Sequence, residues 1–166
     1  NAVEARGGEL IELLVREVGK PVRESRAEVA RAVAILRYYA QAAYDPVAEI
    51  FPVAEAGTEL RVHRRPVGVV AAICPWNFPV AIPAWKIAPA LAFGCTVVFK
   101  PAELVPASAW ALVEIASRAG LPPGTLNLVV GPGRIVGERL VHDPRVRGVS
   151  FTGSQAVGAR VAQAMA

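Results

Sequence analysis

The sequence predicts an α/β fold: a doubly wound, mostly parallel sheet preceded by two helices. Two short apolar runs, Val67–Ile73 and Thr96–Phe99, each end in polar residues, and the segment between them, Phe78–Phe93, has the length of a crossover helix. Apolar β-branched runs of this kind indicate strands that are covered on both faces, as in a parallel sheet. After Glu103 helix-like and strand-like segments continue to alternate, which extends the same pattern.

Two amphipathic helices are expected before the sheet. The first covers residues 2–19, with leucines on one face and Gly19-Lys20-Pro21 as its stop. The second runs from about Ser25 to Ala43, where apolar residues recur at spacings of three and four until Asp45-Pro46. Both are expected to act as covering elements.

A half-exposed strand is expected over Glu59–Arg65, where apolar and charged residues alternate after a turn at Gly57-Thr58. Such a strand suits the edge of a sheet. At Pro66 the composition changes from this alternation to the apolar run of a buried strand.

The C-terminal half carries two further strands, each followed by a helix. The expected elements are a helix over Pro106–Ala119, a strand over Leu126–Val130, a helix from Gly131-Pro132-Gly133 to about Val141, a strand over Val146–Phe151, and a last helix opened by Thr152-Gly153-Ser154.

Composition excludes several classes of protein. With 54% hydrophobic and 19% charged residues the chain is globular, and its net charge of +4 is scattered rather than gathered into a nucleic-acid footprint. The uncharged run Val67–Trp85 is interrupted by three prolines, which argues against a membrane span. Two cysteines, Cys74 and Cys95, form no disulfide framework and no metal motif, so a cytoplasmic protein is expected. The charged opening without an initiator Met suggests a piece of a longer protein.

Asn77 and Lys100 are the first candidates for function, because each follows a strand and ligands bind beyond the carboxyl ends of parallel strands. Lys100 with Glu103 suits the hydroxyls of a ribose, or is a solvated pair that ends the strand. Asn77 either supplies a functional amide or serves a local turn, and the residues alone favour the turn.

Two glycine-containing turns could bind phosphate. Gly131–Gly137 resembles a phosphate turn with one residue too many before its last glycine, and a tight strand-to-helix turn explains it equally well. Ser154 opens a helix whose free amides could take a pyrophosphate. The alternative, slightly favoured by spacing, is that Ser154 caps its own helix.

Five motifs then appear together in a fixed order: PWNFP at 75–79, AWKIAPALAFG at 84–94, VVFKPAE at 97–103, GLPPGTLNLVVGPG at 120–133 and SFTGS at 150–154. Together they resemble the aldehyde dehydrogenase superfamily, most of all its bacterial semialdehyde dehydrogenases such as those acting on 2-oxoglutarate semialdehyde. The likeness is close from Pro66 to about Gly158 and looser before Asp45.

The resemblance implies a role for each candidate. Asn77 would supply the amide of the oxyanion hole, Lys100 and Glu103 would contact the adenosine ribose, and Trp76 would form a wall beside the cofactor. The cofactor would be NAD, with NADP as the alternative, because Glu103 would repel a 2′-phosphate while Lys100 could offset that repulsion. The positions implied to bind it are Ile73, Trp76, Lys100, Ala102, Glu103, Gly133, Phe151, Thr152, Gly153, Ser154 and Gly158.

The resemblance also divides the chain into three parts. Residues 1–50 would be N-terminal helices, 51–65 the start of an oligomerisation region, and 66–166 Rossmann-like βαβ units; the complete protein would be a dimer or tetramer. The family's catalytic cysteine and general-base glutamate come after the FTGS motif, so the catalytic domain would be absent, and Cys74 and Cys95 would be core thiols.

The parent reaction would oxidise an aldehyde or semialdehyde: a thiolate attacks it, hydride leaves for the nicotinamide, and the thioester is hydrolysed. The alternative is a non-catalytic nucleotide-binding or interaction module on the same scaffold.

Overall fold

The computed structural model describes residues 2–46 and 48–166. Its elements, in chain order, are α1 (Ala2–Ala5), α2 (Gly7–Val18), α3 (Val22–Ala42), β1 (Ala48–Phe51), β2 (Leu60–His63), β3 (Val69–Ile73), α4 (Ala81–Ala92), β4 (Thr96–Lys100), α5 (Pro106–Arg118), β5 (Leu126–Leu128), the π-helix η1 (Gly133–Gly137), α6 (Glu138–Val141), β6 (Val146–Phe151) and α7 (Gln155–Met165).

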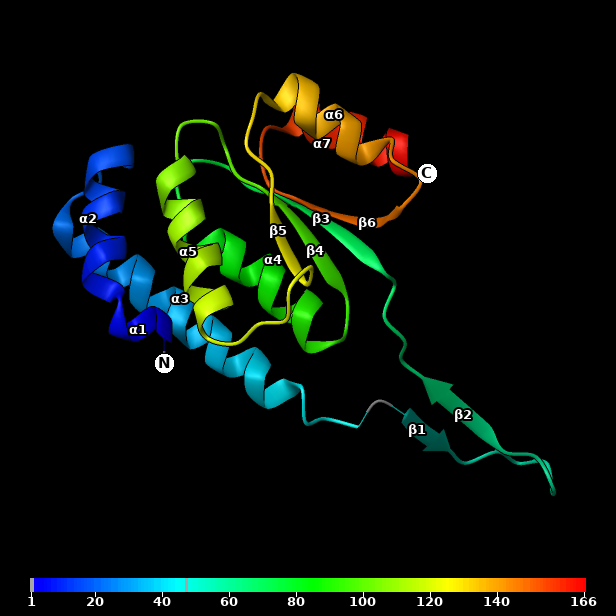
Figure 1. Ribbon diagram of the computed structural model, residues 1–166. Helices are drawn as coiled ribbons and strands as arrows, with labels where there is room; N and C mark the ends of the chain where they lie inside the picture. The colour runs from blue at the N-terminus through cyan, green and yellow to red at the C-terminus, as the bar shows by residue number, and fades with distance from the viewer. Residues whose placement is uncertain (1, 47) are drawn as a thin grey trace.

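Four parallel strands form the central sheet in the order β5-β4-β3-β6. Helices α4 and α5 lie on one face of this sheet and α6 and α7 on the other, so the sheet is doubly wound as predicted (Figure 1). The register sets Ile73 beside both Lys100 and Phe151, which brings the carboxyl ends of three adjacent strands to one edge. The apolar runs became strands because both of their faces are covered.

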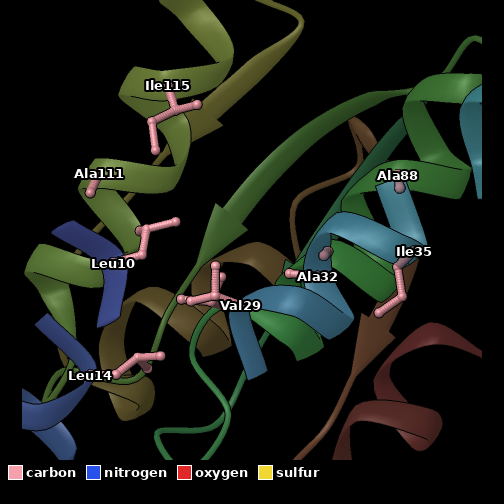
Figure 2. Packing of buried hydrophobic residues seen from close by; sticks show 10 residues of the cluster. Leu10, Leu14, Val29, Ala32, Ile35, Ala88, Ala111 and Ile115 are labelled. Carbon is pink, nitrogen blue, oxygen red and sulfur yellow. The ribbon is translucent and has the colours of Figure 1, made fainter. Parts of the chain in front are cut away.

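Helices α2 and α3 form an additional layer outside α4 and α5. One apolar cluster joins these four helices, and Figure 2 shows Leu10 and Leu14 of α2 pointing toward Val29 of α3, with Ala111 and Ile115 on α5 beside them. A second cluster, centred on Phe99 of β4, joins the sheet to α4 and α5. The N-terminal helices therefore cover the domain as expected, and they do so by packing on helices rather than on the sheet.

The segment before β3 differs from the expectation. Leu60–His63 is a strand, but each of its four residues is exposed, so the prediction of a half-buried strand was wrong. Its partner is β1, which pairs with it in an antiparallel two-stranded sheet that projects from the body (Figure 1). Residues 48–50 of β1 fall in the range 1–50 that the sequence predicts to be N-terminal helices. A four-residue strand shows too little alternation to be recognised from the sequence.

The other differences concern element ends. The helix expected over 2–19 divides at Arg6 into α1 and α2, α4 begins at Ala81 rather than Phe78, and β5 ends at Leu128. Gly19 ends α2 in the left-handed conformation at φ 70°, which explains why the predicted stop holds. None of the helices in the described residues is both long and apolar enough to span a membrane.

Candidate functional site

A cleft of about 570 Å³ lies at the edge of the sheet where β3, β4 and β6 end. It is lined by all of the sequence-predicted site residues except Gly158, namely Ile73, Trp76, Asn77, Lys100, Ala102, Glu103, Gly133, Phe151, Thr152, Gly153 and Ser154. The parallel register produces this convergence, because neighbouring strands deliver their last residues to the same place. Cys74, Pro75, Ile82, Leu104 and Val157 also line the cleft and were not predicted to do so.

Lys100 is held at the floor of the cleft. Its side chain is only 4% exposed, and its Nζ donates to the carbonyl oxygen of Pro101 at 2.8 Å. Burial lowers the pKa of Lys100, while the neighbouring Glu103 carboxylate acts in the opposite direction. The interpretation of Lys100 and Glu103 as a solvated surface pair is therefore wrong, because the ammonium is buried and only Glu103 is exposed.

Asn77 lies in the loop between β3 and α4. Asn77 is exposed and lines the cleft beside Trp76, which is half exposed. The Asn77 carbonyl oxygen accepts a hydrogen bond from Lys20 Nζ at 2.8 Å, which fixes the backbone of the loop. In the described part of the chain its side-chain amide makes no hydrogen bond that would close a local turn, so the structure leaves that amide available to a ligand.

Helix α7 begins at the cleft. Ser154 occupies the N-cap position with extended backbone, but its side chain makes no capping hydrogen bond within the described residues, so the prediction that Ser154 caps its own helix was wrong. Ser154 and Val157 line the cleft from this first turn. An uncapped helix N-terminus carries free amides and partial positive charge, which suits an anion.

Phe151, the last residue of β6, separates Gly153 from Gly158. A Cβ atom at Gly153 would lie 2.5 Å from Cζ of the Phe151 ring, so glycine is required for this close approach. Gly158 lies behind the same ring, and its amide donates to the Ser154 carbonyl oxygen at 2.9 Å. Gly158 therefore supports Phe151 and does not line the cleft.

The glycines after β5 serve a tight turn. Gly131 has a φ of 153°, and a Cβ atom there would lie 2.7 Å from Val136 Cγ2. The amides of Ile135 and Val136 both donate to the Pro132 carbonyl oxygen, at 3.0 and 2.9 Å, and are therefore not free for a phosphate. Of the two interpretations, the geometry favours the tight turn, and only Gly133 reaches the cleft.

The two cysteines lie at opposite ends of the sheet. Cys74 follows β3 at the cleft, whereas Cys95 precedes β4, and both are buried. Burial raises the pKa of Cys74 to about 12, against the opposing effect of the Lys86 and Lys100 ammonium groups. The sequence shows no cation next to Cys74, yet the fold supplies two; burial nevertheless dominates, so the expectation of a neutral thiol stands.

Sequence reasoning missed Lys20 and Glu28. Both are buried, neither lines the cleft, and together they bind the backbone of residues 77–81. The sequence offered one signal, a lysine between Gly19 and Pro21 after a helix, which was assigned only to the helix stop. In the part of the chain that the structure describes, no three His, Cys, Asp or Glu side chains are grouped as metal ligands would be.

The chain matches the model of the aldehyde dehydrogenase family over residues 1–166. It is 47% identical over 158 residues to the mitochondrial succinate-semialdehyde dehydrogenase of Arabidopsis thaliana, covering 95% of this chain and 30% of that protein. It is 44% identical over 162 residues to the alpha-ketoglutaric semialdehyde dehydrogenase of Bacillus subtilis, covering 98% of this chain and 33% of that protein.

Solved structures agree with these relatives. An aldehyde dehydrogenase from Brucella melitensis biovar abortus superposes with a TM-score of 0.95 at 41% identity, over 99% of this chain and 34% of that one. The structure of PnpE in complex with nicotinamide adenine dinucleotide gives 0.93 at 40% identity, over 98% of this chain and 34% of that one. The chain thus spans about a third of the length of the proteins it matches. With the whole chain matched and the motifs converging on one cleft, the chain belongs to the aldehyde dehydrogenase family.

Proposed function

We propose that this chain is the cofactor-binding part of an NAD(P)-dependent aldehyde dehydrogenase that oxidises an aldehyde or semialdehyde to its carboxylate through a thioester. The observation that carries the proposal is the cleft at the ends of β3, β4 and β6, where Asn77, Lys100 and Glu103 meet. The names of the relatives from Arabidopsis thaliana and Bacillus subtilis, both semialdehyde dehydrogenases, support the substrate class.

The residues present fit a dinucleotide. Lys100 offers a buried ammonium and Glu103 an exposed carboxylate, a pair that can donate to and accept from ribose hydroxyls. The uncapped first turn of α7 suits a pyrophosphate, and a side chain at Gly133 would point into open space at the cleft, so glycine there leaves room for close approach. When bound, the nicotinamide would supply a hydride acceptor.

Within this chain, Asn77 has the role closest to the chemistry. Negative charge develops on the aldehyde oxygen when a nucleophile adds to the carbonyl carbon, and a fixed amide donor binds that oxygen more strongly as the charge grows. Asn77 is exposed to the cleft on a loop whose backbone is already held. The nucleophilic thiolate and the general base would come from outside these 166 residues, because Cys74 and Cys95 are buried.

The β1–β2 hairpin is proposed as an oligomer contact of the complete protein. Ile50, Leu60 and Val62 on it are 67%, 50% and 43% exposed, and among the described residues each of its strands pairs on one side only. Two free cysteines fit a cytoplasmic compartment.

The test is the Asn77→Ala substitution in the complete enzyme, assayed with NAD and a panel of short aldehydes and semialdehydes. Turnover is expected to fall by about 10²–10³-fold, the usual cost of one oxyanion donor, with little change in NAD affinity. An unchanged kcat would return Asn77 to a structural role. A wild-type protein that binds NAD yet oxidises no aldehyde would favour the non-catalytic module.

A further inference from the structure

A buried ion pair joins the N-terminal helices to the loop that carries Asn77. Lys20, in the turn between α2 and α3, is 8% exposed, and Glu28, on α3, is 2% exposed. Lys20 Nζ contacts Glu28 Oε2 at 2.5 Å. Burying two charges costs free energy, and well-packed apolar residues of similar volume are often as stable or more so. The pair therefore calls for an explanation beyond packing.

Glu28 holds the start of α4. Its other oxygen, Oε1, accepts hydrogen bonds from the backbone amides of Val80 and Ala81 at 2.9 and 3.1 Å. Val80 occupies the N-cap position of α4 and has no side-chain oxygen to cap the helix. The carboxylate of α3 thus replaces a local cap, and its negative charge complements the helix dipole.

Lys20 holds the other end of the same loop. Its Nζ donates to the Asn77 carbonyl oxygen at 2.8 Å and lies 3.8 Å from the centroid of the Phe78 ring. This carbonyl belongs to the peptide bond that joins Asn77 to Phe78, and the ring is the side chain of the next residue, so the cation–aromatic contact adds to the hydrogen bond at the same point of the loop. The pair thereby fixes residues 77–81 without lining the cleft.

We infer that Lys20 and Glu28 are positioning residues that set the direction of the Asn77 side-chain amide, an inference that rests on the proposed function of Asn77. An oxyanion donor is effective only if it is oriented before charge develops. Asn77 lies on an exposed loop, so its orientation has to come from its backbone, and the groups that hold this backbone are Lys20 and Glu28. Neither side chain lines the cleft, so both act through Asn77.

The test is a double-mutant cycle in the complete enzyme. Lys20→Met alone would leave the Glu28 charge buried without its partner and could prevent folding. The variant for the cycle is therefore Lys20→Met/Glu28→Gln, which removes both charges and keeps a carbonyl oxygen for the α4 amides. Its kcat is expected to fall by about 10- to 100-fold, as for a displaced catalytic group, with the KM for NAD little changed. In an Asn77→Ala background the same change should have almost no further effect on kcat.

Glu17→Gln is the matched control. Glu17 likewise bridges two helices, accepting from the amides of Ala107 and Ser108 at 2.7 and 2.8 Å at the start of α5, away from Asn77. It should lower the melting temperature and leave kcat unchanged. Hydrogen exchange at the amides of Val80 and Ala81 provides a readout besides activity. It should accelerate in the double variant, because the neutral amide oxygen of glutamine accepts more weakly than a carboxylate, but not in Glu17→Gln.

The outcomes are distinct. An unchanged kcat in Lys20→Met/Glu28→Gln, or an equal fold-loss with and without Asn77, would reduce the pair to a stabilising contact and leave the proposed function standing. An unchanged kcat in Asn77→Ala alone would overturn the proposed role of Asn77, and the positioning role of the pair with it, while the dehydrogenase assignment is tested separately by the activity of the wild type. Faster exchange of Val80 and Ala81 together with a kcat loss that disappears in the Asn77→Ala background would establish the positioning role.

Discussion

Replacing Gly153 with alanine should disturb the cleft through the Phe151 ring. A Cβ atom at position 153 would lie 2.5 Å from Cζ of Phe151, and 3.1 and 3.2 Å from Cε2 and Cε1. Carbon atoms rest at about 3.5–4.0 Å from each other, so the ring or the backbone has to move by about 1 Å. Gly153 does not have the left-handed backbone that would itself exclude alanine, so the clash with the ring is the cause of the effect.

The magnitude follows from the packing around the ring. Overpacking of this kind costs about 1–3 kcal/mol when the surroundings cannot yield. If the ring instead swings into the cleft, it takes space from the ligand, and a loss of the same size in binding free energy is about 5- to 150-fold in affinity. We therefore expect Gly153→Ala to lower the melting temperature, the NAD affinity, or both. Thermal unfolding and calorimetric titration of NAD measure the two effects.

Gly158→Ala is the control on the other side of the same ring. Its Cβ atom would lie 3.4 Å from Phe151 Cε1, which is ordinary contact, and alanine in the interior of α7 gains up to about 1 kcal/mol of helix stability over glycine. This variant should be as stable as the wild type or more so. If Gly153→Ala matched the wild type in both melting temperature and NAD affinity, or if the two variants behaved alike, the steric reasoning would be refuted.

Three further predictions follow from the same site. Glu103→Gln in the complete enzyme should weaken NAD more than NADP, because a carboxylate accepts from a ribose hydroxyl but repels a 2′-phosphate; equal changes in the two titrations would contradict this. Because burial raises the pKa of Cys74 to about 12, its thiol stays protonated below that pH; alkylation by iodoacetamide at pH 8 should be slow and should accelerate as the pH rises toward 12, and fast reaction at pH 7 would count against it. The 166 residues alone should form no NADH from aldehydes, and turnover that survived Cys95→Ser but disappeared in Cys74→Ser would identify Cys74 as a nucleophile after all.

The central sheet was predictable because its signals are local. Val69–Ile73 and Thr96–Lys100 are β-branched runs with both faces buried, and the intervening helix fixes a parallel connection. Because neighbouring parallel strands end at the same edge of a sheet, the carboxyl ends of these two strands had to lie side by side. Asn77 and Lys100 could therefore be placed at one site from the sequence alone.

Other features were not predictable because they depend on partners far along the chain. Ala48–Phe51 becomes a strand by pairing with Leu60–His63, and neither strand has a buried face to impose alternation. Ser154 has the residue type and spacing of a cap, yet its side chain does not bond the helix. Gly158 follows the FTGS motif at helical spacing, and only the position of the Phe151 ring shows that it faces away from the cleft.

The cleft is held by two different means, and the difference explains why α2 and α3 matter to it. Lys100 and Phe151 end strands of the sheet, so their backbones are fixed by ladder hydrogen bonds on both sides of β3. Asn77 stands beyond the sheet on a loop that reaches past the last ladder bond, and no strand can hold it there. The loop is fixed instead by Glu28 of α3 and by Lys20 in the turn between α2 and α3. In the apolar cluster of Figure 2, α3 packs on α4, and α2 packs on α3 and α5. Helices α2 and α3, which the sequence predicts only as covering elements, are therefore needed to complete the site. A mutation that loosens their packing, such as Leu14→Ala, should change the direction of the Asn77 amide, although Leu14 lies outside the cleft.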